Sequence, residues 1–340
     1  MHEIFSQIDE FRFRGLHPRV RIGTASDRYA GWIGQVYSEH RYADRITSRK
    51  KTVGRRAFVE KVLPVECVSE YFQHFAVLEL DFTFYRPLLD ETEQPTPSFH
   101  LLRKYRACMN GPDRIILKVP QMIFARKLRR GGTYVPNDQY LNPEGFIRRF
   151  HTPAVEVLGT CLGGFIFEQE YQRKQDRVSP ERLARELDRF FTRIPEDRRY
   201  HIELRTEAYL SAPVFRVFEK HGLGQVLSNW TWLPSLSRQH GLSGGRFFNT
   251  GGECVIRLMT PSGMRYEDAY ARAYPFGALV DGMLDEEQVR KTAEFLYASV
   301  EKGIRINVIV NNRYGGNAPI TAQHIARQFV RRMSRSAAEE

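Results

Sequence analysis

Short apolar runs alternate along the chain with longer segments of helical spacing. Eight runs rich in aliphatic, β-branched and aromatic residues predict strands, over 20–24, 77–86, 115–119, 164–167, 200–205, 224–228, 253–259 and 304–311. Apolar residues three or four positions apart predict helices, over 64–75, 99–109, 143–158, 179–191, 212–221, 285–302 and 320–333. Each predicted strand except the sixth is followed by a clear helix.

The repeated strand and helix unit predicts an α/β fold, a single (β/α)8 barrel of the TIM type. We expect the barrel domain over 19–333, an N-terminal extension over 1–18 and a C-terminal tail over 334–340. An open Rossmann-type sheet is the alternative, but Gly23-Thr-Ala-Ser lacks the glycine spacing of a dinucleotide-binding turn. The polar, basic segment 41–63 predicts a loop inserted after the first strand.

Polar side chains stand at or near the ends of most predicted strands. In a (β/α)8 barrel the C-terminal strand ends share one face, and that face carries function. Because a buried charge costs several kcal/mol unless it is paired, the acids and bases at this rim must neutralise one another. The residues expected there are Glu79, Asp81, Lys118, Glu168, Glu203, Arg205, Arg257, Asn311 and Asn312.

The charge balance favours an anionic partner. The chain has 51 basic and 40 acidic residues and a formal net charge of +11, with Arg as the main basic residue. Arginine binds carboxylate and phosphate groups through two parallel hydrogen bonds. Phosphorylated ligands and nucleic acid are therefore candidate partners.

Neither a disulfide framework nor a membrane segment is predicted. Cys67, Cys108, Cys161 and Cys254 lie far apart, and none belongs to a CxxC pair. The N-terminus lacks the apolar stretch of a secretory signal, and no run approaches the roughly 18 apolar residues that a membrane span needs. We therefore expect a cytoplasmic protein with no membrane partner.

The carboxylates at the rim suggest acid–base chemistry. Glu79 and Glu203 form the candidate catalytic pair of a hydrolase such as a glycosidase, and Glu168 is a third candidate. In such a pair one acid protonates the leaving oxygen, and the other serves as nucleophile or base. The alternative is that these acids only hold neighbouring Arg and Lys side chains in place.

The cations at the same rim suggest a binding site for an anion. Lys118, Arg205 and Arg257 are candidate phosphate ligands, since Arg binds phosphate in a bidentate manner and Lys binds it as a point charge. Asn311 and Asn312 can hydrogen-bond a sugar or a base. This set predicts a polar or anionic small-molecule ligand.

Aromatic residues add candidate stacking surfaces. Tyr29, Trp32 and Tyr85 fall in loops or at strand ends near the predicted rim. Stacking on such rings is typical of nucleic-acid and sugar binding, although packing in the core is the commoner role for each ring.

The histidines do not predict a zinc site. Several of them fall in predicted helices, and His201 begins a strand, away from the face that carries chemistry. A Mg²⁺ or Mn²⁺ site made of carboxylates remains open, with Glu79, Asp81 and Glu168 as candidate ligands. Asp81 is also a candidate substrate ligand.

Four segments resemble the YecE-like family, which is domain of unknown function 72 (DUF72). Val-Leu-Glu-Leu-Asp-Phe-Thr-Phe-Tyr-Arg, over 77–86, resembles the family strand VEINSTFYR. Ile-Leu-Lys-Val-Pro over 116–120, Ile-Glu-Leu-Arg over 202–205 and Val-Asn-Asn-Arg-Tyr-Gly-Gly-Asn-Ala-Pro over 310–319 resemble further family segments. The matches follow one another in order along most of the chain.

The resemblance implies a TIM-like barrel but no particular reaction. It places seven residues at positions that match the family pattern, namely Glu79, Lys118, Glu203, Arg205, Arg257, Asn311 and Asn312. Two differences stand out: Asp81 replaces a family Asn, and Arg257-Leu-Met-Thr lacks the His of the family's R-x-H-G segment. A mechanism that depends on that His cannot apply to this chain.

Two functions are consistent with these observations. The leading hypothesis is a hydrolase-like enzyme that acts on a phosphorylated, sugar-like or nucleic-acid ligand at the C-terminal mouth. The alternative is a non-catalytic binding protein for nucleic acid or another anionic ligand, which uses the mouth and the basic residues Arg49 to Arg56.

Overall fold

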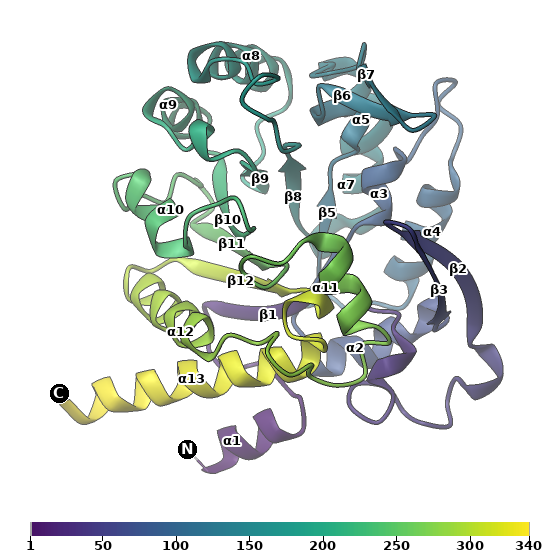
Figure 1. The fold of residues 1–340 in the computed structure, drawn as a ribbon, viewed down its shortest axis with the longest axis vertical. Coiled ribbons are helices and arrows are strands. Elements are labelled where there is room, and N and C mark those ends of the chain that lie inside the picture. The colour runs from purple at the N-terminus through teal and green to yellow at the C-terminus, as the bar shows by residue number, and fades with distance from the viewer. Residues whose placement is uncertain (1, 340) are drawn as a thin grey trace.

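A closed barrel of eight parallel strands forms the centre of the computed structural model, which describes residues 2–339 (Figure 1). The strands follow chain order around the barrel, and β1 closes it by pairing with both β4 and β12. They are β1 (Val20–Ala25), β4 (Val77–Leu80), β5 (Arg114–Lys118), β8 (Leu162–Glu168), β9 (Tyr200–Glu203), β10 (Gly224–Asn229), β11 (Glu253–Leu258) and β12 (Arg305–Val310). The predicted (β/α)8 barrel is confirmed.

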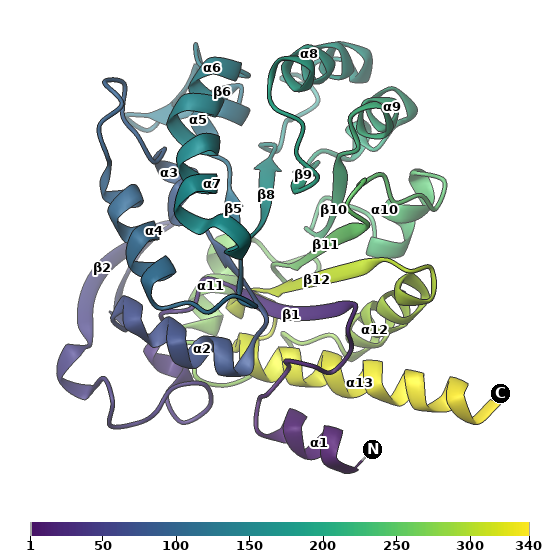
Figure 2. The ribbon, with the colours of Figure 1, turned by 180° about the vertical axis from the view of Figure 1, so that it is seen from behind.

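Helices surround the barrel and shield its outer face from water (Figure 2). They include α2 (Val68–His74), α4 (Pro97–Ala107), α7 (Thr152–Leu158), α8 (Pro180–Arg193), α9 (Ala212–His221), α12 (Glu286–Glu301) and α13 (Ala318–Glu339). The N-cap side chains Ser179 and Asp285 accept hydrogen bonds from backbone N–H groups in the first turns of α8 and α12. Pro180 follows its cap directly, where the missing N–H costs nothing.

Several predicted boundaries are wrong. The strand expected over 77–86 ends at Leu80, because the chain turns after Asp81 into the short helix α3 (Phe82–Tyr85). The Thr83 hydroxyl donates to the carbonyl of Lys118 at 2.7 Å and fixes this turn against β5. The segment 143–158 is helical but interrupted, with α6 (Pro143–Phe146) joined to α7 by a π-helical turn.

Four helical segments outside the predicted bounds were missed or underestimated. A short helix, α10 (Leu236–Leu242), does follow the sixth barrel strand, and α11 (Tyr266–Ala273) precedes α12. The last helix runs to Glu339, so most of the predicted tail is helical. The N-terminal extension contains α1 (His2–Asp9), which packs against α13.

The basic segment 41–63 is mainly an antiparallel hairpin of β2 (Thr47–Val53) and β3 (Arg56–Val62), so the predicted loop is wrong. One face of this hairpin packs Val53 and Phe58 against α11. This face contains few apolar residues and several Lys and Arg residues. The alternation of apolar and polar residues that is typical of a strand was therefore not visible in the sequence. Both this hairpin and a second one, β6 (Lys127–Arg130) with β7 (Thr133–Pro136), follow barrel strands and therefore lie at the C-terminal face.

The inside of the barrel contains an apolar layer below a charged layer. The apolar layer is a cluster of Ala25, Val77, Ile116, Ile166, Val226, Val255 and Ile309. Because alternate residues of a strand point to the same side, the residues two positions further on also point inward, nearer the C-terminal mouth. Those residues include Glu79, Lys118, Glu168 and Arg257, all of which are buried.

Two further findings concern regions outside the site. No helix within residues 2–339 has the length and apolar character required to cross a membrane. Each of the four cysteines is a free thiol, and Cys67, Cys161 and Cys254 are buried.

Candidate functional site at the barrel mouth

Arg257 occupies the centre of the charged layer. Its Nε and Nη2 atoms donate to the two carboxylate oxygens of Glu79, each at 2.7 Å. Its Nη1 atom donates to Glu203 at 2.5 Å and lies 3.3 Å from an oxygen of Glu168. Only 1% of Arg257 is exposed, so its guanidinium lies inside the barrel. From β11 it binds carboxylates on β4, β8 and β9, none of which pairs with β11.

Glu168 binds the two cations that lie closest to the open mouth. Lys118 Nζ contacts one carboxylate oxygen of Glu168 at 2.5 Å, and Arg205 Nη1 donates to the other at 2.6 Å. The side chains of Lys118 and Arg205 are 10% and 17% exposed, whereas Glu79 and Glu203 are fully buried. Lys118 and Arg205 are therefore the charged groups of this network that an incoming ligand can reach.

The network shifts the pKa values of Glu168 and Glu79 in opposite directions. Burial would raise the pKa of Glu168, but Lys118, Arg205 and Arg257 outweigh burial and hold that pKa well below its usual range. Burial raises the pKa of Glu79, and Arg257 and Lys118 offset part of this increase. Although burial opposes the charge of Arg257, its three carboxylate partners raise its pKa. Glu168 therefore remains an anion at neutral pH.

Aromatic side chains cover the mouth around Arg205. The Arg205 guanidinium lies 4.0 Å from the ring centre of Trp230, which stacks on Trp232 with centroids 5.3 Å apart. Trp230 Nε1 donates to Glu203 at 3.0 Å, so one ring contacts both the buried network and the mouth cation. The partly exposed Tyr171 packs beside Trp232 at 5.0 Å.

The other predicted site residues lie at the rim and divide into two groups. Tyr85 is 71% exposed and available to a ligand, and Asp81 is exposed with Ser26 as its hydrogen-bond donor. Asn311 and Asn312 instead support the backbone. The Asn311 side chain accepts from the N–H of Arg313, and Asn312 accepts from Trp32 and from the N–H of Ala318.

Trp32 does not form a stacking surface, because it is completely buried. Its Nε1 atom donates to Asn312 at 3.1 Å, and its ring packs against Tyr29 and Tyr37. Trp32 therefore has the commoner role of such a ring, which is packing in the core.

Several buried N–H groups of the mouth segments make no hydrogen bond within the described residues. They are Arg205 Nε, Trp232 Nε1, Asn312 Nδ2 and Arg313 Nε. A buried donor without a partner costs about 1–3 kcal/mol. Buried acceptor oxygens without a partner among the described residues also follow barrel strands, at Asp27, Gln169 and Glu170, so a ligand with both donors and acceptors suits these segments.

The carboxylate metal site that the sequence left open finds no support in the positions of its candidate ligands. Glu79 and Glu168 direct their oxygens to Arg257, whereas Asp81 contacts Ser26 at 3.2 Å. In the part of the chain that the structure describes, no three His, Cys, Asp or Glu side chains are placed to hold a metal ion.

Sequence reasoning missed Trp230, Trp232 and Asp27. The two tryptophans directly follow β10, so aromatic residues just after a strand end were the available signal. Asp27 follows β1 and is 1% exposed; Tyr105 donates to one of its oxygens at 2.8 Å, and the other has no hydrogen-bond partner among the described residues. Burial raises the pKa of Asp27 to about 7, against the lowering effects of Tyr105 and Arg28.

A cleft of about 120 Å³ lies between the β2–β3 hairpin and the ends of β1 and β4. Asp27 and Asp81 line it on the barrel side, and Arg49, Lys51 and Lys61 line it on the hairpin side. The cleft therefore lies at the C-terminal end of the barrel, on the side of the hairpin.

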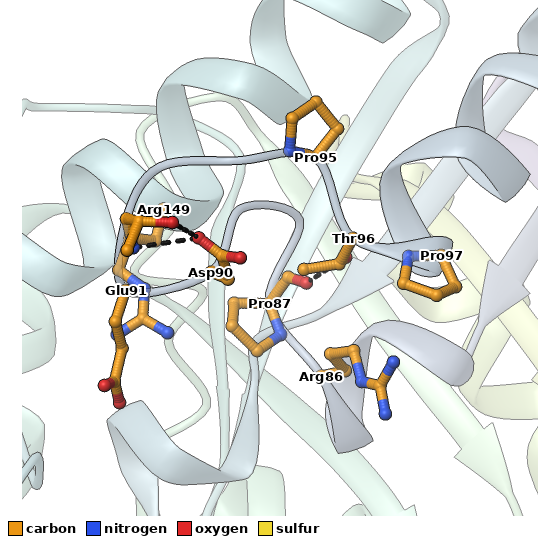
Figure 3. A pocket seen from close by; sticks show the side chains of 9 residues that line it. Arg86, Pro87, Asp90, Glu91, Pro95, Thr96, Pro97 and Arg149 are labelled. Carbon is orange, nitrogen blue, oxygen red and sulfur yellow. Dashed lines mark hydrogen bonds between the residues drawn. The ribbon is translucent and has the colours of Figure 1, made fainter.

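A separate hollow of about 500 Å³ lies between α3 and α4 and includes Arg149 (Figure 3). One of its two acids, Asp90, accepts hydrogen bonds from Thr92 and from the N–H of Gln94, which belong to the same loop. Thr96 donates to the carbonyl of Pro87 across this loop. These contacts give Asp90 a role in shaping the loop.

Comparisons with known proteins agree with this architecture. A family model described as a protein of unknown function, DUF72, matches residues 21–340. A solved DUF72 family protein from Enterococcus faecalis is 14% identical with a TM-score of 0.53, over 91% of this chain and 95% of that chain. Another from Thermotoga maritima is 15% identical with a TM-score of 0.52, over 93% and 99%. A search of curated proteins gave no match.

Proposed function

We propose that this chain, which belongs to the DUF72 family, is a hydrolase-like enzyme that acts on a phosphate-bearing ligand at the barrel mouth. The observation that carries the proposal is the convergence of Lys118 and Arg205 on Glu168 below an aromatic surface. Burying so many charges is costly, and such networks concentrate at functional sites.

The donors of the mouth fit a phosphate group. Lys118 has further N–H donors besides the one directed at Glu168, and Arg205 Nε has no partner within the described residues. A phosphate oxygen in this position would receive charge-assisted hydrogen bonds from both side chains. The rings of Trp232 and Tyr85 would contact the sugar or base that carries the phosphate.

The three glutamates take different roles in this proposal. Glu168 stays ionised, so it orients a water molecule by accepting a hydrogen bond, and it does not act as the proton donor. Lys118 and Arg205 stabilise the charge that develops on the phosphate oxygens while the water oxygen bonds to phosphorus and the ester P–O bond breaks. The water releases its proton to the solvent, and the departing alcohol oxygen takes up a proton from the solvent. Glu79 and Glu203 are enclosed by Arg257 and hold that guanidinium in place, which leaves the predicted catalytic pair as positioning groups.

Ligand binding provides the first test. A nucleoside monophosphate and a sugar phosphate should each raise the melting temperature more than their unphosphorylated counterparts, since a ligand that binds the folded state stabilises it. Lys118→Gln and Arg205→Gln should remove this difference. Lys302→Gln, at the far end of α12, is the control and should retain it. Equal shifts with and without phosphate would contradict the proposal.

A non-catalytic binding protein is the second candidate, because every carboxylate of the network is already bound to a cation. Glu168→Gln separates the two candidates. Removing its charge frees Lys118 and Arg205, so affinity for phosphate ligands should rise in either case. Hydrolysis of p-nitrophenyl phosphate or its diester should fall about 100-fold only if the protein is an enzyme that uses Glu168. Absence of turnover in the wild-type protein with phosphate monoesters and diesters would favour the binding function.

A further inference from the structure

Two hairpins at the C-terminal face hold most of the excess positive charge. Residues 47–62 include six basic residues and one acid, and residues 127–136 include three basic residues and no acid. These hairpins therefore account for +8 of the net charge of +11. Figures 1 and 2 show both on the same side of the barrel.

Most of these cations are not used to stabilise the fold. Arg49 and Lys51 contact Glu60 at 2.7 and 3.1 Å and hold the inner face of the first hairpin. By contrast, Lys50, Arg55 and Arg56 are exposed and have no ion-pair partner among the described residues. On the second hairpin, Lys127 pairs with Asp176 at 2.9 Å, whereas Arg129 is exposed and has no ion-pair partner among the described residues. Unpaired exposed cations on a projecting hairpin are available to a polyanion.

The first hairpin lies across a cleft from the ends of β1 and β4. The cleft between them is lined by Lys61 from β3 and by Ser26 and Asp81 from the ends of barrel strands. Tyr85 lies one helical turn beyond Asp81, at the rim of the mouth. A chain of phosphates that begins at Lys118 and Arg205 can therefore continue along this side of the barrel.

Exposed rings accompany the charge. Tyr85 and Tyr134 are each 71% exposed, and Tyr171 is 48% exposed. Tyr85 and Tyr171 follow β4 and β8, and Tyr134 belongs to the second hairpin. Rings next to cations bind single-stranded nucleic acid, because unpaired bases stack on the rings while the backbone contacts the cations. In a duplex the base faces are already stacked.

We propose that the phosphate-bearing ligand is single-stranded nucleic acid, which runs from the mouth across the two basic hairpins. This proposal rests on the proposed function and specifies its ligand. The mouth binds one phosphate and its nucleoside, and the hairpins bind flanking phosphates without reading the sequence. A mononucleotide fits the mouth but cannot reach the hairpins.

Fluorescence anisotropy with a labelled oligothymidylate of about 20 nucleotides tests the proposal, since such a strand is longer than a typical single binding site. The variant Lys50→Gln/Arg55→Gln/Arg56→Gln should lose at least about tenfold in affinity at low salt. Its slope of log affinity against log salt should be smaller by about 2, because each lost phosphate contact removes about 0.7. Binding of thymidine monophosphate should be unchanged.

A matched control removes the same charge elsewhere. Arg185→Gln/Arg189→Gln/Arg193→Gln changes three exposed arginines on α8, a helix on the outer wall of the barrel. This control should bind the oligonucleotide like the wild-type protein. Equal losses in the two triple variants would show an effect of net charge alone and would overturn the role of the hairpin.

The remaining outcomes separate this inference from the proposed function. If the hairpin variant binds the oligonucleotide normally while Lys118→Gln abolishes binding, the hairpin inference fails and the proposed function stands. If sugar phosphates bind but no oligonucleotide does, the nucleic-acid assignment fails alone. If no phosphate compound binds, both fail. Tighter binding of a duplex of the same length would overturn the single-strand assignment.

Discussion

Replacing Arg257 with Met should destabilise the protein strongly, because it removes the centre of a buried ion network. Arg257 makes two hydrogen bonds to Glu79 and one to Glu203, and all three side chains are at most 1% exposed. Removal of one partner from a buried ion pair costs about 3–5 kcal/mol, since the other charge stays buried without compensation. We expect a loss of this size in the free energy of unfolding near neutral pH.

The loss should depend on pH in a defined direction. Burial already raises the pKa of Glu79 above its usual value, and without Arg257 that pKa rises further. A group with a raised pKa in the folded state contributes stability that is present below its unfolded pKa and is lost as pH rises through its folded pKa. The deficit of Arg257→Met should therefore shrink as pH falls below neutral toward the ordinary pKa of a glutamate, about 4.3.

Urea unfolding followed by circular dichroism at several pH values measures this deficit. Arg290→Met is the control, because Arg290 also contacts two glutamates, Glu287 and Glu294, but is half exposed on α12. Exposed ion pairs contribute about 1 kcal/mol or less. Adding Glu79→Gln to Arg257→Met should recover part of the stability. A deficit no larger than the control's, or one that is constant with pH, would refute this reasoning.

Three further predictions concern single groups. The native pKa of Asp27, about 7, lies above its pKa in the unfolded chain, so the wild-type protein should lose about 1.4 kcal/mol of stability per pH unit as pH rises from about 5 to about 7. Asp27→Asn should remove this loss, which urea unfolding at a series of pH values measures. Trp230→Phe should cost about 1–3 kcal/mol in the same assay, since Glu203 loses a buried donor. Tyr270→Phe removes the hydroxyl that donates to Glu60, so amide hydrogen exchange should become faster in β2 and β3 with little change in global unfolding.

The sequence contained strong information on the barrel and on its charged layer. Period-two alternation put Glu79 two residues after Val77 and Arg257 two residues after Val255, so their inward direction followed once the strands were recognised. Which acid pairs with which base did not follow, because Arg257 reaches across the barrel to strands that are not its neighbours. That choice depends on side-chain length and on the curvature of the closed sheet.

The β2–β3 hairpin shows why other elements were harder to predict. Only one of its faces is packed, and that face contains Arg49, Lys51 and Glu60 as well as Val53 and Phe58. Ion pairing with Glu60 permits charged residues at positions that a hydrophobic pattern would leave for apolar ones. Which residues form these ion pairs depends on the folded structure. The pattern of polar residues along the chain therefore predicted a loop.

The distribution of charge separates two tasks within one face of the barrel. At the mouth, the charges of Glu79, Glu168 and Glu203 balance those of Arg257, Lys118 and Arg205, so the network adds no net charge. The hairpins at residues 47–62 and 127–136 hold the excess instead. A neutral network holds its hydrogen-bond donors in place but does not attract anions in general. The exposed cations of the hairpins attract anions electrostatically over a distance of about 10 Å at moderate salt. Attraction of the ligand should therefore weaken with salt much more than its contacts at Lys118 and Arg205 do.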